Sequence, residues 1–139
     1  MSTTAAITVK LNDGTFRQVY CHYDGYVKGT GKTLFEYYND QELAERVTSL
    51  GDVSWLGPEY HPDIYSPHTW CDPQPGVTVL YGRERGEPDC HPVVFHSEEE
   101  FQRDGVIEDF NYLFKDGEWL VFNARQKPYE WKPLAACNL

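Results

Sequence analysis

The sequence is poor in cysteine and in basic residues, and it has no long apolar run. Its four cysteines, Cys21, Cys71, Cys90 and Cys137, are spread over 139 residues. Cysteines this sparse do not form the framework of a disulfide-stabilised domain and are typical of a reducing compartment. No apolar stretch approaches the roughly 20 residues that cross a bilayer, and the N-terminus lacks the basic-then-apolar order of a signal peptide. We therefore expect a cytosolic location and no membrane partner.

Basic residues are scarce relative to acidic ones. The chain has 12 Lys and Arg against 22 Asp and Glu, which gives a net charge of −10 and a pI near 4.8. This charge repels phosphate groups and attracts cations, so we expect no direct nucleic-acid binding and a preference for basic partners. Because 40% of the residues are apolar and 15% are aromatic, the chain can bury a core, and we expect one domain over residues 1–139.

The negative charge is concentrated in the middle of the chain, where residues 51–100 hold 10 acidic and 2 basic residues. Residues 84–118 hold 11 acidic and 3 basic residues. We take the following acidic residues as a candidate partner-binding surface: Glu98, Glu99, Glu100, Asp104, Glu108 and Asp109. The run Glu98–Glu100 also has a structural interpretation, because carboxylates commonly occupy the first turn of a helix, where they complement its dipole.

The N-terminal region predicts a β-hairpin. Residues 6–11 alternate between apolar and polar, an Asn-Asp-Gly turn follows, and residues 16–23 are rich in β-forming side chains. The register of this hairpin stays open. A two-residue turn places His22 on the face of Ile7, whereas a three-residue turn places Cys21 there.

Further elements follow along the chain. Residues 112–114 and 119–122 flank an Asp-Gly turn and predict a second hairpin, and residues 77–81 and 93–95 predict two more strands. Segment 51–76 mixes five prolines with aromatic residues, so we expect it to be irregular.

Helix starts are predicted at three places. Thr33 with Glu36 and Ser97 with Glu100 have capping-box spacing, and Asp40 precedes another apolar-periodic stretch. The whole pattern predicts an α+β fold, in which a mainly antiparallel sheet is built from the N- and C-terminal hairpins and carries two or three short helices on one side.

A second candidate site combines polar and basic side chains from separate segments. Gly29–Thr33 resembles the end of a phosphate-binding loop, but the required earlier glycine is replaced by Tyr26. Lys32 can still hold an anion, and Tyr23 and Tyr81 are available to stack a base. The ligand-binding alternative consists of His22, Asp24, Lys32, Arg83 and Arg85.

Catalytic and metal-ligating patterns are weak, so we assign no catalytic residue, no metal and no cofactor. Adjacent residues of a strand point to opposite faces, which keeps the Cys21 thiol away from the His22 imidazole as its base. Among the Cys/His pairs, only His68 and Cys71 have ligand-like spacing.

Several blocks resemble a family of small acidic proteins encoded by bacteriophages and prophages, whose function is unassigned. The resemblance rests on the Tyr20–Tyr26 block (Tyr-Cys-His-Tyr-Asp-Gly-Tyr), the Tyr81–Glu87 block (Tyr-Gly-Arg-Glu-Arg-Gly-Glu) and the Tyr112–Trp119 block, which occur in this order. It implies a viral protein that acts in the host cytoplasm, and it implies no catalytic residues.

The charge pattern and the resemblance together predict a non-enzymatic phage accessory protein. We expect it to bind and inhibit a host protein with a basic surface, such as a CRISPR or restriction component or the host polymerase, by acidic nucleic-acid mimicry. The alternative is a small-ligand module that binds or degrades a phosphorylated nucleotide signal. A third interpretation is a minor virion or assembly component.

Overall fold

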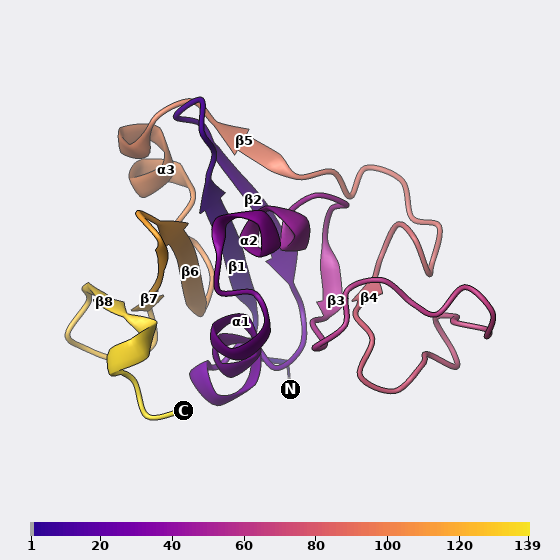
Figure 1. Cartoon of the computed structure of the whole chain (residues 1–139). Helices are drawn as coiled ribbons and strands as arrows, with labels where there is room; N and C mark the ends of the chain where they lie inside the picture. Colours follow the sequence, from indigo (N-terminus) through magenta and orange to yellow (C-terminus); the bar gives the residue numbers. More distant parts are fainter. Residues whose placement is uncertain (1) are drawn as a thin grey trace.

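Two β-hairpins form the centre of the fold. A computed structural model describes residues 2–139 of the chain. In it, β1 (Ala5–Lys10) pairs antiparallel with β2 (Phe16–Cys21), and β6 (Phe110–Lys115) pairs antiparallel with β7 (Glu118–Asn123). The hairpins join through a parallel pairing of β1 with β6 (Figure 1).

The remaining strands extend this sheet on both sides. The strand order is β4-β3-β2-β1-β6-β7-β8, and β5 also pairs with β2. The outer strands are β3 (Val53–Trp55), β4 (Val79–Leu80), β5 (Val93–Phe95) and β8 (Trp131–Pro133). The α+β class is confirmed, but the sheet is mixed, because β1–β6 and β2–β3 are parallel pairs. These partners are distant in sequence or joined through helices, so local turn signals do not reveal them.

The register of the first hairpin is now defined. Ala5 lies opposite Cys21 and Ile7 lies opposite Val19. Cys21 therefore shares the face of Ile7 and is fully buried, while His22 belongs to the other face. The second hairpin closes at Asp116 and Gly117, whose φ angles of 53° and 81° are those of a type I′ turn.

Two of the three expected helix caps are present. α2 (Gln41–Val47) begins after Asp40, whose carboxylate accepts a hydrogen bond from Leu43 N at 2.7 Å. α3 (Glu98–Asp104) begins after Ser97, whose hydroxyl accepts from Glu100 N at 3.1 Å.

The expected cap at Thr33 is wrong. α1 (Lys32–Tyr37) continues directly from a π-helical turn at Val27–Gly31, so the chain is already helical before Thr33. The Thr33 hydroxyl instead donates a hydrogen bond to Gly29 O at 3.2 Å.

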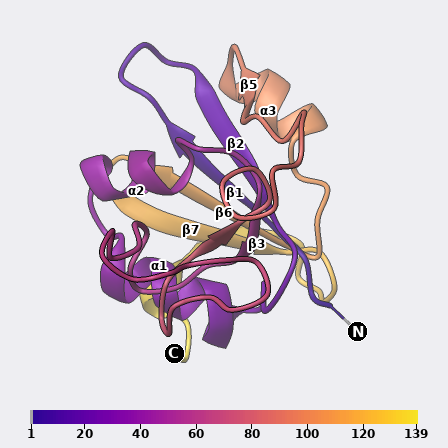
Figure 2. The same ribbon diagram turned by 90° about the vertical axis from the view of Figure 1, so that its right-hand side faces the viewer.

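Helices lie on both faces of the sheet. α1 and α2 cover one face, where Leu34 and Val47 join the main core with Ile7. α3 lies on the opposite face, and its Phe101 ring stacks on Phe16 with centroids 5.4 Å apart (Figure 2). We call this opposite face the back face. Two helices therefore share a side, and the third does not.

The proline-rich region is largely irregular. Within segment 51–76 the one regular element is β3, and the expected strand at 77–81 is reduced to β4 with a single bridge from Val77 to Glu59. Among residues 2–139, no helix has the length and apolarity needed to cross a membrane.

Candidate functional site

A row of aromatic side chains lies on the back face, away from α3. The pairing of Cys21 with Val53 and of Val53 with Leu80 directs those three side chains into the core. Because side chains alternate along a strand, Tyr20, His22 and Tyr81 emerge on the back face. Tyr23 follows the end of β2 and Trp70 belongs to the irregular segment, and both join this row through ring contacts. We call the following residues the aromatic strip: Tyr20, His22, Tyr23, Trp70 and Tyr81, with Arg85 at its end.

The rings of the aromatic strip form two contacting groups, one from the end of β2 and one from Trp70 and Tyr81. The His22 ring centroid lies 5.8 Å from that of Tyr20 and 4.5 Å from that of Tyr23. Trp70 lies 5.3 Å from Tyr81 in the same measure. Tyr23 N–H donates to the carbonyl of Ser54, which brings this end of β2 against β3.

The imidazole of His22 is fixed by Tyr20. The Tyr20 hydroxyl lies 2.6 Å from His22 Nδ1. Burial raises the pKa of Tyr20 to about 12, so at neutral pH the phenol keeps its proton and is available as a donor. The contact holds the imidazole beside Tyr20 and occupies its Nδ1 atom.

Two half-buried carboxylates flank Tyr20. Asp52 Oδ1 accepts a hydrogen bond from Tyr20 N at 3.0 Å. Glu108 is held by Asn111, whose side chain bonds both the N–H and the C=O of Glu108. Burial raises the pKa of Asp52 and that of Glu108. Within residues 2–139, neither carboxylate has a Lys, Arg or His nitrogen within 4.0 Å.

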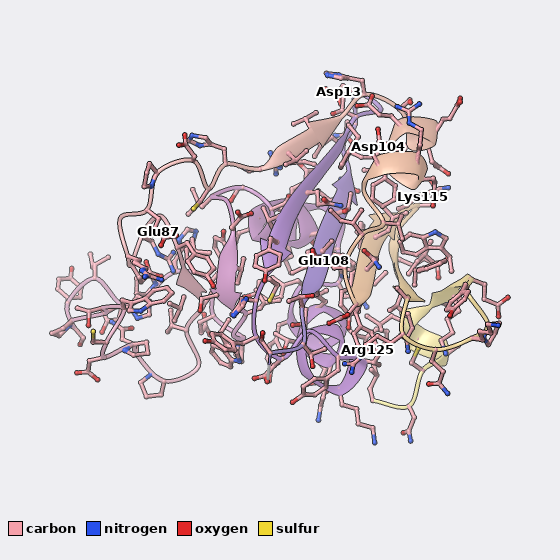
Figure 3. All side chains as sticks on the ribbon, turned by 180° about the vertical axis from the view of Figure 1, so that it is seen from behind. Asp13, Glu87, Asp104, Glu108, Lys115 and Arg125 are labelled. Carbon is pink, nitrogen blue, oxygen red and sulfur yellow. The ribbon has the colours of Figure 1, made fainter. Side chains whose placement is uncertain are left out.

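A separate group of acidic side chains lies at the other end of the sheet. The β1–β2 turn, the β6–β7 turn and α3 meet there: Lys115 Nζ reaches Glu98 at 2.9 Å, and Asn12 and Asp116 line one shallow pocket. Asp13 and Asp104 lie at this end (Figure 3). We call the following residues the acidic end: Asp13, Glu98, Glu99, Glu100, Asp104, Asp116 and Glu118.

Part of this charge is neutralised within the chain. Glu98 pairs with Lys115, and Asp104 pairs with Arg103 at 3.0 Å. Glu99 remains exposed, with no salt bridge among the described residues.

The acidic residues expected to form one surface are divided by the fold. Glu98, Glu99, Glu100 and Asp104 belong to α3. Glu108 and Asp109 precede β6, so they lie at the opposite end of that strand, and Asp109 accepts hydrogen bonds from Thr4 at 3.4 Å. The length of β6 places Glu108 and Asp109 roughly 20 Å from Glu98, which contacts Lys115 at the far end of that strand. Asp104 lies between the two, because four residues of chain keep it within roughly 14 Å of Glu108.

The residues of the ligand-binding alternative are also separated. Lys32 lies on α1, with Glu36 as its salt-bridge partner at 4.0 Å. Asp24 has a φ of 57° and accepts a hydrogen bond from Thr30 N through its backbone carbonyl. No described contact joins Lys32 to His22, Arg83 or Arg85. Of this set, His22 and Arg85 belong to the aromatic strip.

Arg83 is part of a buried structural network. Its guanidinium donates to both oxygens of Glu84 at 2.6 and 2.8 Å and to Thr78 O at 2.9 Å. Glu84 Oε1 also accepts from Leu80 N and lies 3.1 Å from His68 Nε2. This network anchors the irregular region to β4 through Nε and Nη2 of Arg83, whereas Nη1 is buried without a hydrogen-bond partner among the described residues.

Arg85 is more accessible. Its guanidinium lies 4.9 Å from the Trp70 ring centroid and 3.3 Å from Glu87, and half of its side chain is exposed.

The cysteines show no reactive or metal-binding arrangement. Burial raises the pKa of the Cys21 thiol to about 11, which keeps it protonated and unreactive. All four cysteines are free. In the described part of the chain, no three His, Cys, Asp or Glu side chains are grouped so that they could hold a metal ion.

Comparisons with known proteins give no family assignment: no family model, curated protein or solved structure matches the chain. The resemblance to phage proteins therefore remains a prediction.

Tyr20, Asp52 and Trp70 belong to no site predicted from the sequence. The spacing of Tyr20 and His22 already indicates a shared face of one strand. The positions of Asp52 and Trp70 depend on the pairing of β2 with β3 and on an irregular loop, which no local pattern encodes.

Proposed function

We propose that this protein is a non-enzymatic phage accessory protein that binds and inhibits a host protein with a basic surface. The observation that carries the proposal is the acidic end, where α3 and two hairpin turns from distant parts of the chain bring their carboxylates together. The host targets that fit are proteins with a basic nucleic-acid channel, such as a CRISPR or restriction component or the polymerase.

Electrostatics supports this type of partner. Carboxylates accept the same charge-assisted hydrogen bonds from Arg and Lys that phosphates accept, so they can occupy a channel built for nucleic acid. A net charge of −10 also accelerates the encounter with a positive surface. Glu98–Glu100 lie in the first turn of α3, where the helix holds their backbones rigid.

The side-chain geometry favours binding over catalysis. Cys21 is a buried thiol, and the Nδ1 atom of His22 is occupied by the Tyr20 hydroxyl. No nucleophile paired with a base opens onto the surface among the groups described above.

The test is capture of host proteins from a bacterial lysate by the tagged chain, with two charge-matched variants. One variant reverses three charges of the acidic end: Glu98→Lys, Glu99→Lys and Glu100→Lys. The control variant reverses three exposed charges elsewhere: Glu36→Lys, Glu42→Lys and Glu59→Lys.

We expect one stoichiometric partner, released by salt, that is lost with the first variant and retained by the second. Equal losses with both variants, or capture that is insensitive to salt, would contradict the proposal.

The small-ligand alternative retains one favourable observation, the exposed guanidinium of Arg85 beside the rings of Trp70 and Tyr81. It predicts a phosphorylated nucleotide that copurifies with the protein and leaves on heating. Mass spectrometry of the heated supernatant tests it, and detection of such a ligand would favour this function over inhibition.

A further inference from the structure

We propose that the aromatic strip, together with Asp52 and Glu108, binds an arginine side chain in a basic segment of the partner protein. This inference rests on the proposed function, because it names the partner chemistry at a second place on the same molecule. The site lies on the back face at the end of β2, and the length of that strand separates Tyr20 and His22 by about 20 Å from the hairpin turns of the acidic end.

The aromatic rings provide faces that attract a cation. Tyr23 is 48% exposed, and His22 and Tyr81 are partly exposed beside it. A guanidinium over a tyrosine ring gains electrostatic attraction without losing much hydration, which makes arginine the cation most often found in this geometry.

The strip already holds one guanidinium from the chain itself. Arg85 lies over Trp70, with its charge balanced by Glu87. The neighbouring Tyr81, Tyr23 and His22 have no such cation within the described residues, although they continue the same surface. An arginine from a partner would repeat the contact that Arg85 makes at the end of the strip.

The two carboxylates supply the complementary charge. Asp52 and Glu108 lie on either side of Tyr20, half-buried and without a basic partner in the described chain. A carboxylate that is partly desolvated and unpaired is stabilised when a cation approaches it. Aromatic faces beside unpaired carboxylates match a planar cation and disfavour a phosphate.

Arginine fits better than lysine for a geometric reason. A guanidinium is planar, so it can stack on Tyr23 or His22 while its N–H groups reach Glu108. An ammonium group is strongly hydrated and cannot stack in this way, so we expect a weaker complex.

The experiment is a titration of the full-length protein with short peptides. Amide NMR shifts locate the binding site, and calorimetry gives the affinity. The probe is a blocked peptide of alternating glycine and arginine, and the comparison ligands are the matching glycine-lysine peptide, free arginine and AMP. Tyr23→Ala and Glu108→Gln probe the site. Tyr37→Ala is a matched control, because Tyr37 is also 48% exposed but lies on α1, and Glu99→Gln controls for charge.

We expect the arginine peptide to shift the amides of Tyr23, Ser54 and Tyr81. Its affinity should fall about fivefold with Tyr23→Ala and by a similar factor with Glu108→Gln. The two control variants should change it less than twofold. Free arginine should bind more weakly than the peptide, because a segment adds neighbouring contacts.

Three results would overturn the inference. One is equal affinity for the lysine and arginine peptides, and another is peptide binding that the site variants leave unchanged. Either result would refute the arginine site without contradicting the proposed binding of a partner to the acidic end. AMP binding that Tyr23→Ala weakens would assign the strip to a nucleotide instead. Conversely, the arginine peptide could bind at this site while no host protein is captured from lysate in a charge-dependent way. That result would refute the proposed inhibition and support the arginine site.

Discussion

Replacing Glu84 with glutamine should destabilise the fold strongly, although the two side chains have the same shape. The Glu84 side chain is 1% exposed, and its oxygens accept hydrogen bonds from Leu80 N and from two nitrogens of Arg83. Glutamine removes the negative charge and turns one acceptor into a donor aimed at Arg83. The Arg83 cation, whose side chain is 24% exposed, then loses its counterion.

The magnitude follows from the burial of this pair. Removing one partner of a buried ion pair costs about 3–5 kcal/mol. Because Arg83 is partly exposed and retains its bond to Thr78 O, we expect the lower part of that range, about 3 kcal/mol. For a chain of this size this corresponds to a drop in Tm on the order of 10 °C.

The assay is urea unfolding followed by circular dichroism, with Glu87→Gln as the control. Glu87 pairs with Arg85, but both side chains are substantially exposed, at 39% and 50%, so this variant should change the free energy of unfolding by less than about 1 kcal/mol. If Glu84→Gln stays within that same margin, the Arg83–Glu84 pair does not stabilise the irregular region and the reasoning is wrong.

The pH dependence gives an independent check. Burial raises the pKa of Glu84, but hydrogen bonds from Arg83 and from Leu80 N outweigh burial, and the net pKa lies below its usual 4.5. A lowered pKa stabilises the folded state above the unfolded-state pKa, and this contribution disappears as the pH falls through the folded-state value. The gap between wild type and Glu84→Gln should therefore shrink as the pH falls below about 4.5.

Three further predictions concern single residues. Burial raises the pKa of Cys21 to about 11, so a thiol reagent at pH 8 should modify exposed Cys71 within minutes and Cys21 only after unfolding, as read by peptide mass spectrometry. Burial raises the pKa of Tyr20 to about 12, so ultraviolet titration of wild type against Tyr20→Phe should show that Tyr20 does not ionise near pH 10, and its contribution to stability should fall as the pH rises past that value. Gly117 has a φ of 81° and open space where the methyl group of an alanine would lie, so Gly117→Ala should cost about 1–2 kcal/mol of unfolding free energy through backbone strain alone; a neutral result in urea unfolding would contradict the type I′ turn.

Local signals in the sequence are sufficient to predict some of the turns and helix caps. Asp116-Gly117 specifies its own turn because both residues tolerate positive φ, and Asp40 and Ser97 cap helices through hydrogen bonds three residues away. Each of these features depends on interactions within a few residues, so no knowledge of the tertiary structure is needed.

Contacts between segments distant in the chain cannot be predicted from such local signals. The parallel contact of β1 with β6 joins residues about a hundred positions apart, and α3 reaches the back face only because the chain crosses over the sheet after β5. Thr33 has capping-box spacing, but the preceding π-helical turn already supplies the helix start. The aromatic strip depends on which face of β2 is buried, which the sequence of the first hairpin leaves open by one residue, and on the pairing of β2 with β3, which no local pattern encodes.

The acidic end and the aromatic strip should contribute to binding in different ways. Exposed carboxylates act over distance and mainly set the association rate, whereas stacked rings act at contact and mainly set the dissociation rate. A standard interface covers about 800 Å² per partner, or roughly 30 Å across, so one partner on the back face can reach both. Residues about 20 Å apart share no partners, so their effects on binding free energy should add. Charge reversal at Glu98–Glu100 should therefore slow association, and Tyr23→Ala should speed dissociation, with neither change affecting the other. Strong non-additivity of the two binding free energies would mean that the two surfaces bind different molecules.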